Sequence, residues 1–383
     1  MKNFSKKLLF HTILSLIILS LTALISCEDY LPVTGGTEPG GTNPGWMDYD
    51  DIDSVPGLAN KLTWLKIHAL SGSSHIIVVD ADESIRLQNL SFDSGRKNIT
   101  ITLRGDGINR IISLSNNVKT NMFQVRTGVT LILENNITLR GHNSNAYPLI
   151  YIEPGGTLRM NNGAAITGNT SKNNISGGVA VYGTFTMSGG TISGNNAGSG
   201  GGVYVPSGGK FTMSDGTISG NSASKGGGVY IYIGDFTMSG GTISGNTADE
   251  SGGGVYVFGH FTMWGGTISD NNAGSGAGVY CSGNIGGSSY SGSSSMIGGI
   301  ISGNNATNYG GGVYIGGNNF QKNGGIITGY PSDQSNGNVV RDSSGIVQSN
   351  RGHAVYTNTK RKETTAGPGV NLSLSSNDGW DFY

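Results

Sequence analysis

Residues 177–329 repeat one pattern of hydrophobic and polar positions, with a period of about 25 to 26 residues. Each unit reads Gly-Gly-Gly-Val-Tyr-Val, a short turn, Phe-Thr-Met, Ser-Gly-Gly and Thr-Ile-Ser-Gly-Asn. Alternation within each run puts Val, Phe, Met and Ile on one side, and Tyr, Thr and Ser on the other. Three short strands per unit, joined by glycine corners, predict an all-β solenoid, the parallel β-helix. A period that does not fit six-residue units favours the right-handed form.

Two columns of residues keep this period most regularly. The isoleucine column comprises Ile166, Ile192, Ile218, Ile243, Ile268, Ile301 and Ile327. Three residues further on, the asparagine column comprises Asn169, Asn195, Asn221, Asn246, Asn271 and Asn304. Stacked asparagine side chains hydrogen-bond to one another along a fibre or solenoid axis. We therefore expect an asparagine ladder at one corner of each coil.

Tyrosine also recurs once per unit, on the side expected to face outward. The column comprises Tyr182, Tyr204, Tyr230, Tyr256, Tyr280 and Tyr314. Stacked in register, these rings would lie about 4.8 Å apart. They form either a self-stacking ladder that supports the sheet, which the sequence favours, or a binding face for a sugar chain or a protein.

The two ends of a solenoid are open edges that need caps. Residues 57–74 are predicted to cap the first coil, because their leucines have helical spacing and would lay one apolar face over it. The β-helix is predicted over residues 75–370, with room for on the order of eleven coils. Residues 371–383 are expected to form a C-terminal cap or tail.

Residues 1–26 have the basic start and the long apolar run of an export signal. The run ends in Leu24-Ile25-Ser26-Cys27, which resembles the bacterial lipobox. That resemblance implies that Cys27 is lipidated and begins the mature chain, tied to the membrane through its lipid. Residues 27–56 have the proline and glycine content of a flexible tether. The expected location is the bacterial cell envelope, at the outer membrane or cell surface; an uncleaved membrane anchor and ordinary secretion are the alternatives.

Composition narrows the class of protein further. Glycine makes up 67 of 383 residues without a Gly-X-Y period, which excludes collagen, and only 12% of residues are charged. A net charge of −1 without clustered Lys and Arg removes the electrostatic case for a nucleic-acid partner. Apart from Cys27 the chain has one cysteine, Cys281, which is expected to be a small buried side chain.

The Gly-Gly-Val-Tyr and Gly-Gly-Thr-Ile-Ser-Gly-Asn units resemble the β-helix repeats of bacterial surface proteins. These include polymorphic outer-membrane proteins and autotransporter passengers. The resemblance covers roughly residues 90–370, although Ile-x-Gly-Asn stands where the polymorphic family has Phe-x-x-Asn. It implies a surface role through shared architecture. The same fold hosts pectate-lyase-like enzymes, so catalysis must be considered residue by residue.

Catalysis on a polysaccharide would need carboxylates gathered on one face. The acids of the regular coils occupy different repeat positions and form no column: Asp215, Asp235, Asp249, Glu250 and Asp270. The histidines are far apart and lack metal-ligand spacing. We therefore predict no catalytic residue, cofactor or metal ligand.

Two functions from different classes remain open. The first is a lipid-anchored, non-catalytic binding, adhesin-like or spacer module, whose partner is a glycan or a host or extracellular protein. The second is a polysaccharide lyase or glycoside hydrolase that acts on acidic polysaccharide in a groove of the β-helix. The sequence leaves the enzyme class open and favours the first.

Overall fold

The computed structural model describes residues 51–92, 95–171, 175–282, 292–317, 319–373 and 378–381. The chain divides into two units, Met1–Asp48 and Tyr49–Tyr383. The predicted export signal, Cys27 and most of the predicted tether lie outside the described residues. In the described part, no helix has the length and hydrophobicity needed to cross a membrane.

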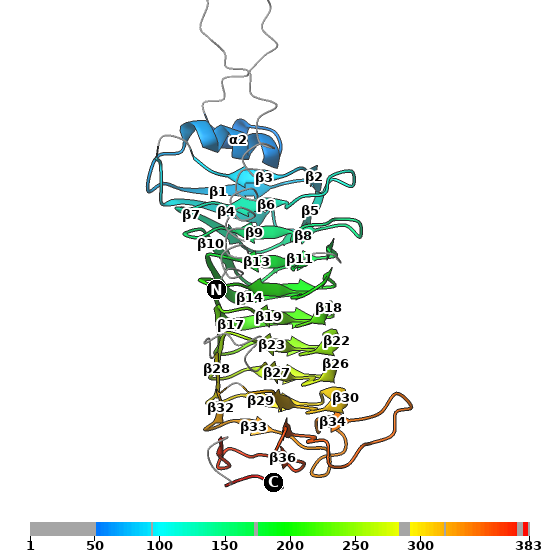
Figure 1. Cartoon of the computed structure of the whole chain (residues 1–383). Coiled ribbons are helices and arrows are strands. Elements are labelled where there is room, and N and C mark those ends of the chain that lie inside the picture. Colours follow the sequence, from blue (N-terminus) through cyan, green and yellow to red (C-terminus); the bar gives the residue numbers. More distant parts are fainter. Residues whose placement is uncertain are drawn as a thin grey trace, which may run out of the picture. The chain divides into compact units, whose positions relative to one another are not determined.

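The second unit is an all-β parallel solenoid of about nine turns, which confirms the predicted fold class. Figure 1 shows its strands stacked coil upon coil, with the one α-helix of the described residues at the N-terminal end. The estimate of eleven coils was too high, because the coils differ in length. Gln88 pairs with Phe123, 35 residues further on, and Val313 pairs with Val355, 42 residues further on.

The described strands form three sheets, which we name after their characteristic residues. The isoleucine sheet has 19 strands: β1 Ser74–Val79, β2 Glu83–Ile85, β4 Ile99–Gly105, β5 Arg110–Leu114, β7 Val129–Leu133, β8 Ile137–Arg140, β10 Thr157–Met160, β11 Ala164–Thr167, β14 Thr184–Ser193, β17 Lys210–Ser219, β20 Asp235–Met238, β21 Thr242–Ser244, β24 His260–Met263, β25 Thr267–Ser269, β28 Ser293–Met296, β29 Ile300–Ser302, β32 Asn319–Lys322, β33 Ile326–Ile327 and β37 Leu372–Ser373. The tyrosine sheet has 11: β3 Gln88–Leu90, β6 Phe123–Val125, β9 Ile150–Ile152, β13 Val179–Val181, β16 Val203–Val205, β19 Val229–Ile231, β23 Val255–Val257, β27 Val279–Cys281, β31 Val313–Ile315, β35 Val355–Thr357 and β36 Arg361–Lys362. The alanine sheet has 7: β12 Thr170–Ser171, β15 Asn196–Ala197, β18 Ser222–Lys225, β22 Thr247–Ser251, β26 Asn272–Ser275, β30 Asn305–Tyr309 and β34 Val339–Val340.

The alanine sheet corrects the prediction of three strands per coil. The Phe-Thr-Met and Thr-Ile-Ser runs both belong to the isoleucine sheet and merge into single strands in β14 and β17. A further short strand follows each asparagine from Asn195 to Asn304 and buries one alanine per coil, as at Ala248, Ala273 and Ala306. Alanine has little tendency to form strands, so this run carries a weak signal in the sequence.

Identical hydrophobic residues stack on one another in the core. The rings of Phe185, Phe211, Phe236 and Phe261 follow one another at centroid distances of 4.8, 4.6 and 5.2 Å. Cys281 takes a valine position of the tyrosine sheet and is fully buried, as predicted. Burial raises the pKa of its thiol to about 12, so this cysteine stays protonated.

Both ends of the solenoid are capped. At the N-terminal end the predicted helix is α2, Leu58–His68, preceded by the short 3-10 helix η1, Ile52–Ser54. The helix buries Leu58, Leu62 and Leu65 against the first coil. Its first turn is capped by Glu83, whose two carboxylate oxygens accept from the Leu58 N–H at 2.8 and 2.9 Å.

At the C-terminal end, Lys322 continues the methionine column, because it pairs with Met296. The column comprises the buried residues Met160, Met187, Met213, Met238, Met263 and Met296. The Lys322 side chain is fully buried, and its Nζ donates to the backbone oxygens of Gly367 at 2.7 Å and Val370 at 2.8 Å. Trp380, in the predicted C-terminal cap, packs against the end of the core. The lysine therefore ties the closing segment to the last coil.

The predicted asparagine ladder is present, and Asn145 and Asn338 extend it at either end. Asn221 shows the repeating unit. Its Nδ2 donates to Oδ1 of Asn246 at 3.0 Å and to the backbone oxygen of Ile192 at 2.9 Å. Its backbone N–H donates to the same Oδ1 at 3.0 Å. Each buried amide between Asn195 and Asn304 thus joins its own coil to the coils on both sides.

We predict that Asn246→Ala lowers the free energy of unfolding by roughly 3 kcal/mol, because it removes the acceptor of two buried donors of Asn221. Chemical denaturation followed by circular dichroism measures this change. Asn272→Ala is the matched control, since Asn272 is exposed and lies just outside the ladder. The control should change stability by less than about 0.5 kcal/mol. Equal effects of the two substitutions would show that the ladder does not hold the coils together.

Glycine permits the coils to approach closely at one recurring corner. Gly241 has a φ of +79°, and a Cβ there would lie 2.6 Å from Met213 Cε and 2.8 Å from the backbone oxygen of Gly216. The same contact with a methionine of the preceding coil recurs along the column of Gly190, Gly216, Gly241, Gly266, Gly299 and Gly325. The methionine column and this glycine column therefore depend on each other.

Gly241→Ala should destabilise the protein more than Gly245→Ala does. Gly245 also has a positive φ, +64°, but an added Cβ has no neighbour nearer than 4.0 Å. Alanine at Gly245 adds only backbone strain of about 1 kcal/mol, whereas alanine at Gly241 adds overpacking of roughly 1–3 kcal/mol. Thermal unfolding of both variants compares the two effects. Equal losses would mean that the close approach of the coils is unimportant.

Candidate functional site: the tyrosine ladder

The tyrosines of the Val-Tyr-Val runs lie opposite one another in adjacent strands of the tyrosine sheet. The paired positions, in order along the axis, are Tyr204, Tyr230, Tyr256, Tyr280, Tyr314 and Tyr356. Their ring centroids are separated by 5.6, 4.9, 5.0, 4.8 and 5.7 Å. Most of these pairs are stacked, and Tyr230 meets Tyr256 edge to face. Each such contact adds about 0.5–1.5 kcal/mol beyond the area that it buries. We call this row of rings the tyrosine ladder.

Tyr182 does not occupy the register position that the sequence suggested. The partner of Tyr204 is Ala180, and Tyr182 lies two residues beyond it. Its ring nevertheless reaches the row, 4.9 Å from Tyr151 and 6.5 Å from Tyr204. Tyr151 is the register partner of Ala180 on the other side and belongs to the ladder, although sequence reasoning missed it.

The ladder is half-buried or buried rather than fully exposed. Tyr204 and Tyr256 are only 6% and 5% exposed, because neighbouring rings cover them. Burial raises the pKa of Tyr280 to about 12 and also raises that of Tyr204 and Tyr230, and the neighbouring tyrosines add to each shift. The hydroxyls of these three residues therefore remain protonated at physiological pH. They offer uncharged donors and acceptors to a partner.

Other aromatic and cationic groups extend the ladder. Tyr232 stacks on Phe258 at 5.5 Å, and each lies two residues after a ladder tyrosine. The regular spacing of this pair could have revealed it. At the C-terminal end Tyr309 stacks on Tyr356 at 4.5 Å, and the Arg351 guanidinium lies 4.5 Å from the Tyr309 ring centre. Sequence reasoning missed these residues, because irregular chain segments bring them together.

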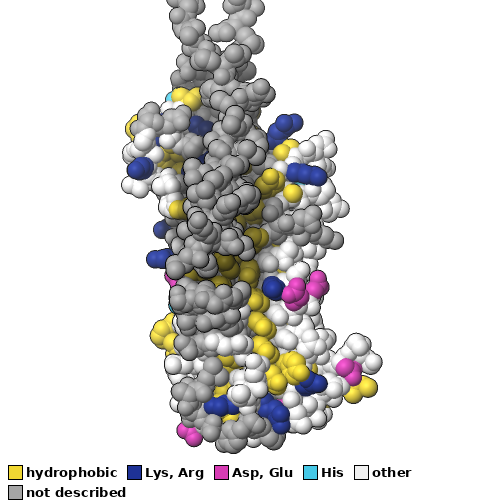
Figure 2. Space-filling view, in the orientation of Figure 1, with side chains coloured by type: hydrophobic (Ala, Val, Ile, Leu, Met, Phe, Trp, Pro, Cys, Tyr) yellow, Lys and Arg dark blue, Asp and Glu magenta, His cyan; other side chains and the backbone are white. Residues whose placement is uncertain are grey.

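Figure 2 shows hydrophobic side chains, tyrosine included, as a stripe over β19, β23 and β27. Lys225 lies beside the ladder: its Nζ is 6.0 Å from the Tyr256 ring centre, and its charge is balanced by an ion pair with Glu250 at 3.2 Å. The stripe is therefore an aromatic, nearly neutral face.

The acids of the regular coils remain apart in the structure, and all are exposed: Asp215, Asp235, Asp249, Glu250 and Asp270. Across the described ranges, no group of three or more His, Cys, Asp or Glu side chains is arranged to hold a metal ion. These acids are therefore scattered over the solenoid surface: Asp215 lies in β17, Asp235 in β20, Asp249 and Glu250 in β22, and Asp270 just after β25.

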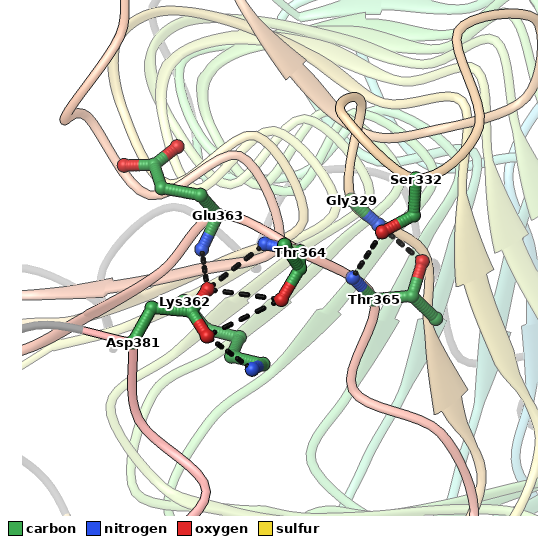
Figure 3. Close-up of polar contacts among 7 residues, drawn as sticks. All are labelled: Gly329, Ser332, Lys362, Glu363, Thr364, Thr365 and Asp381. Atoms are coloured by element: carbon green, nitrogen blue, oxygen red, sulfur yellow. Dashed lines mark hydrogen bonds and ion pairs between the residues drawn. The ribbon is translucent and has the colours of Figure 1, made fainter.

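At the C-terminal cap, Glu363 and Asp381 line one cavity of about 230 Å³, and the Glu363 carboxylate points away from that of Asp381 (Figure 3). Asp381 pairs with Lys362 Nζ and accepts from the backbone N–H groups of Glu363 at 2.8 Å and Thr364 at 3.0 Å. Burial acts to raise the pKa of Asp381, but these hydrogen bonds outweigh it and hold the pKa below its ordinary value.

The carboxylate of Glu363 is engaged in the same way. It accepts from the backbone N–H groups of Gly352 at 2.8 Å and His353 at 3.1 Å. Both carboxylates therefore bind backbone N–H groups near the C-terminal end of the solenoid. The polysaccharide-cleaving alternative gains no support from this pair.

Comparison with protein-family models, with curated proteins and with solved structures finds no match for this chain. The fold and the candidate site together define the class: a parallel β-solenoid with an aromatic ladder on its outer face.

Proposed function

We propose that this protein is a lipid-anchored bacterial surface protein whose β-solenoid is a non-catalytic binding module, with the tyrosine ladder as its ligand-binding face. The observation that carries this proposal is the unbroken row of rings from Tyr204 to Tyr356 on the outside of a repetitive scaffold. Its partner is a glycan or an extracellular protein.

The chemistry of the ladder supports binding of a neutral or weakly polar partner. Aromatic rings offer flat apolar surface, and their protonated hydroxyls can donate to and accept from hydroxyl or amide groups. The rings already support one another by stacking, so a ligand would meet a preformed surface. Preformed surfaces lose less conformational entropy on binding.

The anchor and the location rest on the sequence of residues 1–56. Export followed by lipidation of Cys27 would place the solenoid at the cell envelope, at the outer membrane or cell surface, on a tether of residues 27–56. The resemblance of its repeats to those of polymorphic outer-membrane proteins and autotransporter passengers agrees with such a location.

The lipid anchor predicts that the protein incorporates radiolabelled palmitate when expressed in a bacterium that processes lipoproteins. Cys27→Ala should lose the label and the membrane fraction, because the acylated thiol is absent. Cys281→Ala is the matched control and should keep both, since Cys281 is buried in the solenoid core. Labelling that survives in Cys27→Ala would contradict the anchor.

Binding by the tyrosine ladder is tested with arrays of glycans and extracellular matrix proteins, using residues 28–383. The double substitution Tyr230→Ala/Tyr256→Ala should weaken binding at least about tenfold, because it removes two adjacent rings from the middle of the ladder. Trp264→Ala serves as the control, since Trp264 is an exposed aromatic outside the ladder. Thermal unfolding verifies that the double variant remains folded.

Two outcomes would count against this function. Unchanged binding by Tyr230→Ala/Tyr256→Ala would remove the ladder as the binding face. Release of reducing or unsaturated sugars from acidic polysaccharides by the same protein would contradict the non-catalytic assignment.

A further inference from the structure

The tyrosine ladder is interrupted at one register position, Ala180. Alanine there leaves the space that a tyrosine ring would fill between Tyr151 and Tyr204. The ring of Tyr182 reaches this space from two residues further on, and it meets Tyr204 at an interplanar angle of 71°. The regular stack therefore gives way here to tilted rings with a space beside them.

A groove of about 310 Å³ lies at this interruption. Its walls include the rings of Tyr151, Tyr182 and Tyr204. Gln124 and Glu153 contribute polar groups to the same lining. Gln124 takes the register position next to Tyr151, so the ladder changes from aromatic to polar within one coil. Apolar walls with a few converging polar groups are typical of small-ligand sites.

Hydrogen bonds fix the orientation of the Glu153 carboxylate. Its Oε1 accepts from Nε2 of Gln124 at 2.9 Å and from Nη1 of Arg126 at 2.6 Å. Nε of Arg126 also donates to Oδ1 of Asn89 at 3.0 Å. Within the described part of the chain, Oε2 of Glu153 accepts no hydrogen bond. The carboxylate thus keeps one oxygen available and is held by two neighbours.

We propose that this groove binds one sugar unit of a neutral glycan, an inference that rests on the proposed binding function of the ladder. The ring of the sugar packs against Tyr151 or Tyr182, as polarised C–H groups pack against aromatic faces. The sugar hydroxyls donate hydrogen bonds to Oε2 of Glu153 and to Oε1 of Gln124. Both oxygens are acceptors, which suits a ligand that carries O–H donors.

Glu153 forms an ion pair with Arg126 through Oε1 at 2.6 Å, so selection against acidic sugars rests on its other oxygen, Oε2. A uronate would bring its carboxylate near that of Glu153, and like charges at short distance repel each other. Arg126 does not line the groove, because its guanidinium is turned to Glu153 and Asn89. The groove therefore discriminates between the neutral glycans proposed here and the acidic polysaccharides of the enzymatic alternative.

Two variants test the groove by different means. Glu153→Gln keeps the shape of the side chain but turns the free acceptor into a donor, so affinity for the sugar should fall roughly tenfold. Ala180→Tyr restores the ladder and fills the groove, so it should abolish this binding. Glu134→Gln is the matched control, because Glu134 pairs with Arg104 at 3.1 Å on the isoleucine sheet and does not line the groove.

Calorimetric titration should use neutral oligosaccharides of glucose, mannose and galactose, with oligogalacturonate of equal length as the acidic probe. We expect binding of at least one neutral probe, no binding of oligogalacturonate, and loss in both groove variants. Thermal unfolding establishes that Ala180→Tyr is folded, and Glu153→Gln provides a test that does not depend on it.

The outcomes separate this inference from the function on which it rests. If Tyr230→Ala/Tyr256→Ala loses a ligand that both groove variants still bind normally, the groove is wrong and the ladder stands. Stronger binding of oligogalacturonate than of neutral probes overturns the selectivity. If the intact protein binds proteins on the array but no neutral glycan, the groove inference fails while a binding function remains.

Discussion

The fold depends on one repeated interaction, the hydrogen bonding of buried asparagines from coil to coil. From Asn221 to Asn338, each ladder amide oxygen accepts from the side chain and the backbone of the preceding ladder residue, as Asn246 does from Asn221. A coil shifted by one residue would leave these buried groups without partners, which costs about 1–3 kcal/mol for each. From Asn145 onward the ladder therefore fixes the register of neighbouring coils, and the other columns of these coils follow from that register.

Fixed register explains why identical residues lie on one another and why charge is scarce. Stacking of identical residues is favourable for Phe211 and Phe236 in the core and for Tyr280 and Tyr314 on the outside, because aromatic rings attract each other. It is unfavourable for carboxylates, because a charged column would repel itself. It also requires glycine where neighbouring coils approach closely, as at Gly241 beside Met213. The composition of the chain is thus a consequence of its stacking.

Periodicity made the fold and the asparagine ladder predictable, and the errors arose where periodicity fails. Tyr182 was assigned to the ladder by its identity, although its spacing of 22 residues to Tyr204 is shorter than the repeat. The true register position, Ala180, has no aromatic ring to reveal it. The strands of the alanine sheet were not predicted, because alanine has little tendency to form strands. The contact of Arg351 with Tyr309 was not predicted either, because it depends on an irregular chain segment.

Function in such a molecule is best sought where the repeat is broken. In the regular part of the ladder each tyrosine is held by its neighbours, and its ring is needed for stacking as much as for a ligand. At Ala180 one ring is missing from the stack, yet the backbone of this residue still pairs with the strands on both sides. The scaffold therefore tolerates the gap, and the released space is bordered by a carboxylate that two neighbours hold in place. A repeat that only had to be stable would keep a tyrosine at this position. The interruption is therefore the place where ligand binding can best be separated from the ring stacking that supports the sheet.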